Sequence, residues 1–226
     1  MATKDFFNFN NIMNNDISAI MGSGSLLCSR TDVAESLGYN RGSLAIPKQT
    51  HSTNVLWINS SGEFENCDGL ITDNPNIVLS LQTADCIPIF LYDSVTGLRG
   101  LVHAGWRGVV GGIASNAIEL MIKHHSVVND IQVLLGPSIC KDCFEVGVEV
   151  ADQFDGNFVT TGKNEKYFAN LHDQVKSQLL KYKIDKKNIH KSTTCTFENK
   201  ECCSYRRDGE NAGRMYSFLG VKHGFN

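Results

Sequence analysis

The sequence predicts a mixed α/β fold of the α+β type, and two kinds of segment support this prediction. Short apolar runs bounded by Gly, Asp, Asn or Pro are typical of buried strands, and several of them follow one another closely. Other segments carry apolar side chains at every third or fourth position, which is typical of helices that pack against a sheet. Because strands and helices do not alternate regularly, the pattern disfavours a doubly wound Rossmann fold.

Six segments have the composition of strands and are rich in Val, Ile, Leu and Phe. They are residues 55–58, 77–81, 87–92, 98–103, 131–135 and 215–221. The sequence DSVTG at 93–97 has the polar residues and the glycine of a tight turn. We therefore expect the strands on either side of it to form a hairpin.

Two segments predict amphipathic helices, since each has an apolar stripe wide enough to bury one helix face. The stripe of residues 110–122 consists of Ile113, Ala114, Ala117, Ile118, Met121 and Ile122. The stripe of residues 168–182 consists of Phe168, Leu171, Val175, Leu179 and Tyr182. A third and weaker helical pattern covers residues 144–154.

The length and composition indicate one globular domain spanning residues 1–226. Hydrophobic residues make up 42% of the chain and charged residues 20%, and the net charge of −3 gives no basis for binding nucleic acid or an anionic membrane. No apolar run is long enough to span a membrane, and residues 1–16 lack the features of a signal peptide, so we expect a cytoplasmic protein. In that reducing compartment, the eight cysteines predict free thiols or metal ligands rather than disulfides.

His51 lies just before a predicted strand, Cys86 at the start of one and His103 at the end of one. Two imidazoles and a thiolate from different strand ends would form a three-ligand zinc site with one open position. Their spacing matches no compact zinc finger, and the same side chains can instead be a buried structural thiol and two hydrogen-bonded histidines. A further alternative needs no metal and makes Cys86 a nucleophile with a histidine as its base.

Arginines occur in two polar contexts. Arg107 lies in HAGWRG, a glycine turn between a predicted strand and a predicted helix, where a helix N-terminus and a guanidinium can attract phosphate or carboxylate. Arg206, Arg207 and Arg214 gather in a polar loop before the last predicted strand and could hold the same kind of anion. The alternative is that Trp106 packs in the core and the arginines form ordinary surface salt bridges.

Cys140 and Cys143 form a C-x-x-C pair, which is typical of redox-active thiols or of half a zinc site. Cys202 and Cys203 are the candidates for completing such a site, although adjacent cysteines are poor partners in a tetrahedron. A turn after a strand is the simpler interpretation of this segment.

Three aspartates near these motifs have expected supporting roles. Asp68 and Asp73, in DGLITD, are expected to cap turns. Asp85 is expected to hydrogen-bond a metal-bound histidine. No pair of carboxylates has the features of a glycosidase site.

The chain resembles the YfiH family, whose members are also described as laccase-domain or multicopper polyphenol oxidase proteins. The matching motifs are KQTHS, CDGLITD, LQTADCIPIFLYD, GLVHAGWRG, GPSICKDCFEVG and CSYRRDGENAGRM. They extend from Lys48 to near Val221, whereas residues 1–47 match poorly. The resemblance implies two mixed β-sheets packed between helical layers.

The resemblance also implies an enzyme site. Similar proteins cleave adenosine, inosine and methylthioadenosine with phosphate and deaminate adenosine as a side activity. The implied catalytic residues and metal ligands are His51, Cys86 and His103. The residues implied to bind substrate or phosphate are Gln49, Arg107, Arg206 and Arg214. The implied partners are a purine nucleoside and phosphate, with no prediction of the oligomeric state.

Zinc fits the implied donor set better than copper. A multicopper oxidase needs about ten ligands, most of them histidines, to fill a blue-copper site and a trinuclear cluster. The chain has seven histidines in total. The laccase description therefore conflicts with the composition, and we expect zinc at this site.

Several positions differ from the usual family pattern, and two other functions stay open. Ser52 stands in place of a glycine, Cys202 and Cys203 in place of two phenylalanines, and Ala212 in place of a threonine. One alternative is a Cys-His hydrolase of amide bonds in cell-wall precursors, which an electrophile on Cys86 would block. The other is a non-enzymatic zinc-binding protein, with four protein ligands on the metal and no nucleoside turnover.

Overall fold

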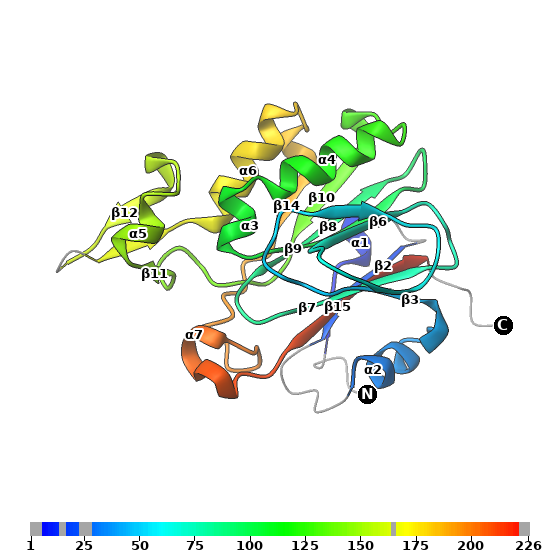
Figure 1. The fold of residues 1–226 in the computed structure, drawn as a ribbon, viewed down its shortest axis with the longest axis horizontal. Helices are drawn as coiled ribbons and strands as arrows, with labels where there is room; N and C mark the ends of the chain where they lie inside the picture. Colours follow the sequence, from blue (N-terminus) through cyan, green and yellow to red (C-terminus); the bar gives the residue numbers. More distant parts are fainter. Residues whose placement is uncertain (1–5, 14–16, 23–28, 164–165, 222–226) are drawn as a thin grey trace.

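The computed structural model describes residues 6–13, 17–22, 29–163 and 166–221. Two six-stranded sheets lie face to face, with helices on both outer sides (Figure 1). This arrangement confirms the predicted mixed α/β fold of two mixed sheets between helical layers.

The first sheet has the strand order β1-β2-β15-β7-β3-β5. Its strands are β1 (Phe6–Asn8), β2 (Ile17–Gly22), β15 (Met215–Val221), β7 (Val78–Thr83), β3 (Leu44–Pro47) and β5 (Gly62–Phe64). Strand β3 runs parallel to both of its neighbours, whereas the other pairs are antiparallel.

The second sheet has the strand order β14-β10-β8-β9-β6-β4. Its strands are β14 (Ile189–Lys191), β10 (Ile131–Leu135), β8 (Ile87–Asp93), β9 (Arg99–Ala104), β6 (Gly69–Thr72) and β4 (Val55–Trp57). Strands β8 and β9 form the predicted hairpin, and the carboxylate of Asp93 accepts hydrogen bonds from the amides of Val95 and Thr96 in its turn.

Successive side chains of a central strand point to opposite faces, and both faces are buried. The sequence of such a strand is therefore a continuous apolar run. On β8, Ile87, Ile89 and Leu91 pack against the helices, whereas Phe90 and Tyr92 pack against the other sheet. A strand that is covered on both faces has no position for a polar side chain, so it loses the period-two signal. The largest contiguous cores therefore lie between helices and sheet and between the two sheets.

Helices cover the outer face of each sheet. Helices α3 (Trp106–Val110), α4 (Ile113–Lys123) and α6 (Leu171–Lys181) lie over the second sheet, and α2 (Arg30–Ser36) lies on the first (Figure 1). The remaining α-helices are α1 (Asn10–Met13), α5 (Val148–Ala151) and α7 (Tyr205–Asp208). Short 3₁₀ helices occupy Arg41–Ser43, Val128–Asp130, Gly156–Phe158, Lys186–Asn188 and Gly209–Asn211.

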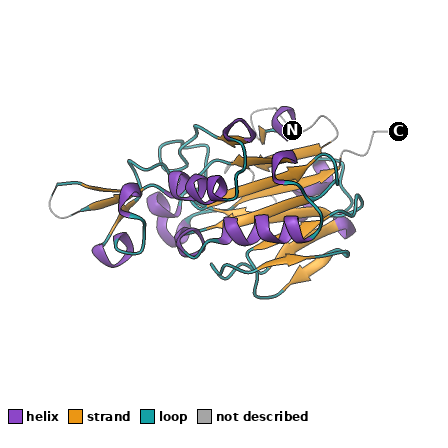
Figure 2. Cartoon of the chain, turned by 90° about the horizontal axis from the view of Figure 1, so that it is seen from above, coloured by secondary structure: helices purple, strands orange, loops and turns teal. Residues whose placement is uncertain are grey.

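A small third sheet projects beyond the two main sheets, together with α5 (Figure 2). It consists of β11 (Glu145–Val146), β13 (Tyr167–Ala169) and β12 (Val159–Thr161). The prediction of a helix over 144–154 was wrong, because the segment begins as β11 and only its middle is helical. Gly147 separates the two parts and is the N-cap of α5.

The two stronger helix predictions are confirmed with changes at their ends. The glycines Gly111 and Gly112 divide the first helix into α3 and α4, and Gly112 adopts a left-handed φ of +85° that interrupts the helix. Ile122 is 40% exposed, so it does not belong to the buried stripe. The second helix begins later than expected, since Phe168 lies in β13.

Strand β2 was missed in the sequence, although it lies in the first sheet between β1 and β15. All six of its residues are buried. In the residues that the structure describes, no helix is both long enough and apolar enough to cross a membrane.

His172 predicts a pH-dependent loss of stability. Its side chain is buried at the start of α6, and Nε2 lies 3.0 Å from Ser138 Oγ. Burial, with a smaller contribution from Lys191, lowers the pKa of this imidazole from 6.5 to about 4. The unfolded chain therefore binds a proton between these two pH values that the folded chain excludes, and stability is lost as the pH falls through this window.

We expect the free energy of unfolding of the wild type to fall by roughly 3 kcal/mol more than that of His172→Gln between pH 6.5 and pH 4. Glutamine keeps a hydrogen-bonding group for Ser138 and does not titrate. Urea denaturation across this pH range measures the difference. Parallel pH profiles for the two proteins would show that His172 takes up its proton in the folded state.

Candidate active site

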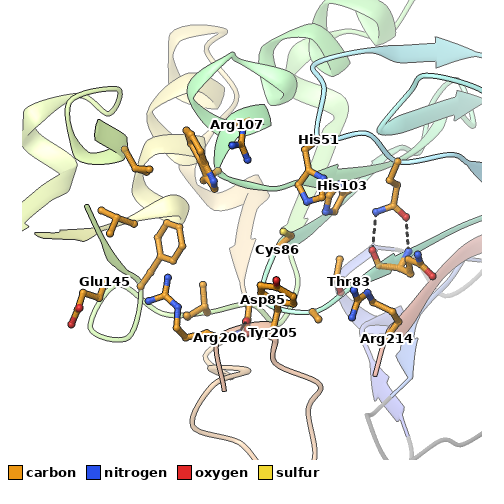
Figure 3. Close-up of a pocket in the computed structure, with 18 of the residues that line it drawn as sticks. His51, Thr83, Asp85, Cys86, His103, Arg107, Glu145, Tyr205, Arg206 and Arg214 are labelled. Atoms are coloured by element: carbon orange, nitrogen blue, oxygen red, sulfur yellow. Dashed lines mark hydrogen bonds between the residues drawn. The ribbon is translucent and has the colours of Figure 1, made fainter. Parts of the chain in front are cut away.

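One cavity of about 670 Å³ brings together all seven residues that the family resemblance implied as site residues. They are Gln49, His51, Cys86, His103, Arg107, Arg206 and Arg214. Figure 3 shows His51, His103 and Cys86 close together, with Arg107, Arg206 and Arg214 around them. The catalytic and binding roles assigned to these residues stay predictions.

The site lies where the chain repeatedly passes from the first sheet to the second. His51 lies between β3 and β4, Asp68 between β5 and β6, and Cys86 between β7 and β8. In each case the first strand belongs to one sheet and the second strand to the other. Three such connections at one edge of the sandwich bring side chains together that are far apart in sequence.

His51, Cys86 and His103 form a compact set of donor atoms, called the triad below. One ligand atom from each residue lies within 4.8 Å of the others. The two imidazole rings meet edge to face, with centroids 4.8 Å apart and an interplanar angle of 82°. His51 is exposed to the cavity, Cys86 is half-buried and His103 is only 3% exposed.

The buried carboxylate of Asp68 holds two members of the triad. Its Oδ1 lies 2.7 Å from His103 Nδ1 and accepts the amide of His51 at 3.0 Å. Its Oδ2 accepts the amides of Thr50 and Ser52 and the hydroxyl of Ser52. Burial alone would raise the pKa of Asp68, but hydrogen bonds from His103, Ser52 and Thr50 outweigh it and hold the pKa well below its usual value.

The surroundings of Cys86 and His103 favour a Cys86 thiolate next to a protonated His103 ring. Burial alone would raise the pKa of Cys86, but the charge of His103 and hydrogen bonds from both histidines lower it to about 6. Burial alone would lower the pKa of His103, but Cys86 and Asp68 raise it to about 9. A thiolate is the form of cysteine that binds metal or acts as a nucleophile.

The backbone is strained at two positions beside the triad. His51 has a φ of +58° and Asp85 a φ of +81°, a region that residues other than glycine rarely adopt. Such strain persists where surrounding contacts enforce it and is concentrated at functional sites. Asp68 enforces the turn at His51, and the hydrogen bonds of Asp85 enforce the other.

The expected contact of Asp85 with a histidine was wrong. Its Oδ1 accepts the hydroxyl of Thr196 at 2.6 Å, and its Oδ2 accepts the hydroxyl of Ser204 at 3.0 Å and the amide of Arg206 at 2.7 Å. Asp85 therefore fastens the corner before Cys86 to two distant loops. The carboxylate that supports a histidine is that of Asp68, which had been expected only to cap a turn.

Three arginines reach the cavity from two sides. In Figure 3, Arg107 lies on one side of Cys86, whereas Arg206 and Arg214 lie on the other. The Arg107 guanidinium stacks 4.3 Å from the centroid of the Trp106 ring, and Arg206 lies 5.4 Å from that of Phe144. These contacts hold the side chains while leaving N–H groups for an anion.

Arg207 is directed away from the cavity. Its guanidinium donates to the carbonyl groups of Thr196, Phe197 and Cys202 and pairs with Asp208. It supports the loop structure, in accordance with the alternative of an ordinary structural arginine.

Gln49 is engaged with the backbone of the neighbouring strand. Its Nε2 donates to the carbonyl of Gln82 at 2.8 Å, and its Oε1 accepts the amide of Gln82 at 2.9 Å. With these two bonds the Gln49 side chain pairs with the backbone of β7 as a neighbouring strand would. They fix the segment before His51. The geometry therefore gives Gln49 a positioning role at the cavity wall.

Sequence reasoning missed several cavity residues, among them Thr83, Phe144, Glu145 and Tyr205. Each lies in a motif that had been noted for another reason, such as the C-x-x-C segment before Phe144. A hydrophobic or aromatic residue in a loop carries no signal of its own, because its cavity contact depends on the tertiary fold. Cys202 and Cys203 were also misplaced, since they pack with Met21 and Met215 rather than with Cys140 and Cys143.

The triad fits zinc in the chemistry and placement of its donors. Two imidazoles and one thiolate are ligands that zinc accepts, and three protein ligands leave one position open. The bond from His103 Nδ1 to Asp68 leaves the other ring nitrogen for a metal, as is usual for a metal-binding histidine. Among the described histidines, only His51 and His103 share a site of this kind.

Comparison with known families gives one match over most of the chain. The model of the family described as multi-copper polyphenol oxidoreductase laccase matches residues 23–222. A prokaryotic protein named as an adenosine deaminase is 35% identical over 210 residues, covering 85% of this chain and 80% of that protein. A purine nucleoside phosphorylase of Clostridium acetobutylicum is 36% identical over 177 residues, covering 76% of this chain and 74% of that enzyme.

Solved structures agree with the fold. YlmD from Geobacillus stearothermophilus superposes with a TM-score of 0.85 at 26% identity, covering 92% of this chain and 93% of that protein. The hypothetical protein YfiH of Bacillus licheniformis superposes with a TM-score of 0.84 at 27% identity, covering 92% and 94% of the two chains.

Gly105 is expected to be essential for the triad. A Cβ at this position would lie 2.8 Å from His51 Cδ2 and 3.2 Å from Cys86 Sγ. Gly105→Ala should therefore displace the ligands and weaken zinc binding by about 10- to 100-fold, the range seen when groups that orient a metal ligand are changed. Competition with a chromophoric chelator measures the affinity.

Gly156→Ala is the matched control, because a Cβ there meets no atom within 4 Å. It should bind zinc as the wild type does. Wild-type affinity in Gly105→Ala would mean that the His51 and Cys86 side chains do not act together on a metal.

Proposed function

The chain belongs to the multi-copper polyphenol oxidoreductase laccase family, and on that premise we propose that it is a purine nucleoside phosphorylase with adenosine deaminase side activity. The observation that carries the proposal is the cavity itself. It joins the triad, aromatic side chains and three arginines in a volume typical of small-molecule sites. Relatives named as purine nucleoside phosphorylases and as an adenosine deaminase support the same substrate class.

Phosphorolysis of a nucleoside sets two requirements for the site. A phosphate oxygen bonds to C1′ of the ribose while the bond from C1′ to N9 of the purine breaks, and its electron pair passes to the base. Positive charge develops on the sugar and negative charge on the purine. Catalysis therefore needs an anchored phosphate on one side of the sugar and a proton donor or another electrophile at the purine.

The arginines meet the first requirement. Arg107 and Arg206 are held by aromatic rings, so their guanidinium groups lose less freedom when phosphate binds. Each guanidinium can donate two parallel N–H bonds to phosphate oxygens. Arg214 offers a third cation from the opposite side of the cavity to Arg107 (Figure 3). We assign phosphate binding to these three side chains.

The triad meets the second requirement. His51 is its exposed member, so its imidazole is the triad group that reaches the purine, whereas His103 lies deeper and is held by Asp68. Bound zinc, held by the triad, would supply a Lewis acid with one free coordination position. Cys86 contributes the negative ligand charge that retains such a cation.

Aromatic groups define where the base lies. Trp106, Phe144 and Tyr205 line the cavity near the arginines, and a purine ring stacks favourably on such side chains. Glu145, also at the cavity wall, is a carboxylate that can accept hydrogen bonds from an exocyclic amino group or the ribose hydroxyls. Deamination, the proposed side activity, would need C6 of adenosine at the triad and a water molecule as the nucleophile.

Substitution in the triad tests the function. Cys86→Ala and His103→Ala should reduce ribose 1-phosphate release from adenosine by at least about 1000-fold, because each removes a group on which the other two depend. Mass spectrometry of reactions with and without phosphate measures both products, ribose 1-phosphate and inosine. A chelated wild-type sample run in parallel shows whether either activity needs the metal.

Three results would contradict this assignment. Undiminished phosphorolysis by folded Cys86→Ala would remove the triad from the reaction. A covalent adduct on Cys86 that stops an amide hydrolysis independent of phosphate would indicate the Cys-His hydrolase instead. Zinc held at the triad by four protein ligands, together with no turnover of any nucleoside, would indicate a non-enzymatic zinc-binding protein.

Substitution of the arginines tests phosphate binding. Arg107→Ala and Arg206→Ala should each raise the KM for phosphate about tenfold or more, since a charged hydrogen-bond pair contributes roughly 1.5–3 kcal/mol. The KM for the nucleoside should change less. Initial rates across a phosphate series give both constants.

Arg41→Ala is the control for a general effect of lost charge. Arg41 is exposed and pairs with Glu35 beside α2, away from the cavity. It should leave the KM for phosphate unchanged. Equal KM values in all three variants and the wild type would exclude the arginines as the phosphate site.

A further inference from the structure

A second group of possible metal ligands, three cysteines and one glutamate, lies next to residues of the cavity wall. It consists of Cys140, Cys143, Cys195 and Glu198, called the cysteine cluster below. One ligand atom from each residue lies within 4.8 Å of the others. The cluster shares no residue with the triad, and the proposed phosphorylase mechanism does not use it.

Two turns of the same spacing supply the four ligands. The first is C-x-x-C between β10 and β11, and the second is C-x-x-E after β14. The amide of Cys143 donates to the carbonyl of Cys140 at 3.1 Å, and the amide of Asn199 donates to that of Cys195 at 2.9 Å. Two facing turns with ligands three positions apart are typical of structural zinc sites, and here a glutamate stands where the fourth ligand is usually Cys or His.

The backbone joins the two turns directly. Ser138 and Cys195 form a parallel β-bridge, and the amide of Thr196 donates to the carbonyl of Ser138 at 3.1 Å. The amide of Cys140 donates to the sulfur of Cys195 at 3.3 Å. This contact holds the Cys195 sulfur against the first turn.

The distances are close to those of an occupied tetrahedron. Zinc–sulfur bonds of about 2.3 Å in tetrahedral geometry place neighbouring sulfurs roughly 3.8 Å apart. Cys143 Sγ and Glu198 Oε1 are already 3.5 Å apart. The other pairs lie within 4.8 Å, so small side-chain rotations would close the site.

The surroundings are suited to a cation that enters from solvent and stays. Cys195 is only 7% exposed, Cys140 and Cys143 are half-buried, and Glu198 is exposed. The Cys195 sulfur is shielded from water, whereas the carboxylate of Glu198 lies on the solvent side of the cluster.

Two arginines offset the negative charge that such a site carries. Arg207 donates to the carbonyl groups of Thr196 and Phe197, inside the second turn. Arg206 donates to the carbonyl of Cys143, in the first turn, at 3.3 Å. Three thiolates and a carboxylate exceed the charge of a divalent ion, so nearby guanidinium groups stabilise the complex.

We propose that the cysteine cluster binds a structural zinc ion through three thiolates and the carboxylate of Glu198. Binding replaces the thiol protons, which pass to solvent, and forms no bond other than those to the metal. Three sulfur ligands select zinc over the hard cations calcium and magnesium. With four protein ligands the site is closed, which separates it in function from the triad and its open position.

The ion would fasten the cavity wall. The first turn is followed at once by Phe144 and Glu145, which line the cavity. The second turn contains Thr196, whose hydroxyl binds the carboxylate of Asp85 beside Cys86. Zinc at the cluster would therefore connect the aromatic wall of the cavity to the corner that positions the triad thiol.

Metal analysis of the full chain purified with zinc and reductant tests the proposal. Elemental mass spectrometry should find roughly two zinc ions per wild-type chain, and about one in either Cys86→Ala or the double variant Cys140→Ser/Cys195→Ser. Cys203→Ala, which changes a buried cysteine outside the cluster, should retain the wild-type content.

The exposed ligand provides a test that does not threaten folding. In a Cys86→Ala background, Glu198→Ala should lower the zinc affinity about tenfold or more, and Glu198→Cys should raise it. Cobalt in place of zinc should give the intense thiolate-to-metal charge-transfer band of a site with three sulfurs. That band should persist in Cys86→Ala and disappear in Cys140→Ser/Cys195→Ser.

Three results would overturn the proposal. One is a Cys86→Ala protein that holds no zinc and whose cluster cysteines alkylate freely or form a disulfide. Another is an unchanged affinity in both Glu198 variants, which would remove the carboxylate from the site. The third is a cobalt band that is lost with Cys86 alone. None of these results depends on nucleoside turnover, so they leave the phosphorylase assignment to its own test.

Discussion

The buried carboxylate of Asp68 is the interaction on which the arrangement of the site depends. It accepts hydrogen bonds from three consecutive amides of the His51 loop and from the His103 ring, so one side chain orients two of the three triad members. A buried charge is costly unless it is fully hydrogen-bonded, and here every bond it accepts comes from a group that the site needs in place. The cost of burying Asp68 is thus offset by contacts that make the loop conformation unique.

The sandwich architecture explains why such a carboxylate is needed. His51, Asp68 and Cys86 each lie on a connection that leaves one sheet and enters the other, where the chain must turn sharply in few residues. The left-handed φ values of His51 and Asp85 are a consequence of these turns. Gly105 completes the packing, because any larger residue would occupy the space of the His51 ring and the Cys86 sulfur. The strain at the site is therefore produced by the fold and held by Asp68 and Asp85.

Much of this could be predicted from the sequence, and what could not depends on tertiary contacts. The central strands and the two long helices were predictable because burial imposes a composition or a period on them. The three residues His51, Cys86 and His103 share one cavity, as the sequence led us to expect, whereas their catalytic roles stay predictions. Strand β2 was missed because its short run ISAIMG is interrupted by Ser18 and is less clearly apolar than the central strands. The roles of Asp68 and Asp85 were interchanged, since a sequence does not show which of two aspartates lies beside a histidine ring.

The two groups of possible metal ligands do not fit the copper chemistry that the family's description implies. A blue-copper site and a trinuclear cluster together require about ten ligands, mostly imidazoles brought close to one another. Here the described histidines are dispersed, and only His51 and His103 among them belong to the triad. His172 bonds to Ser138 in the core, and His124 stacks on Trp57. The second cluster contains no histidine, only three sulfurs and one carboxylate. Neither donor set is of the type that several copper ions share, whereas each one separately matches a tetrahedral zinc site, one open and one closed. Under the two proposals made above, the triad carries the substrate chemistry, and zinc at the cysteine cluster holds the cavity wall together.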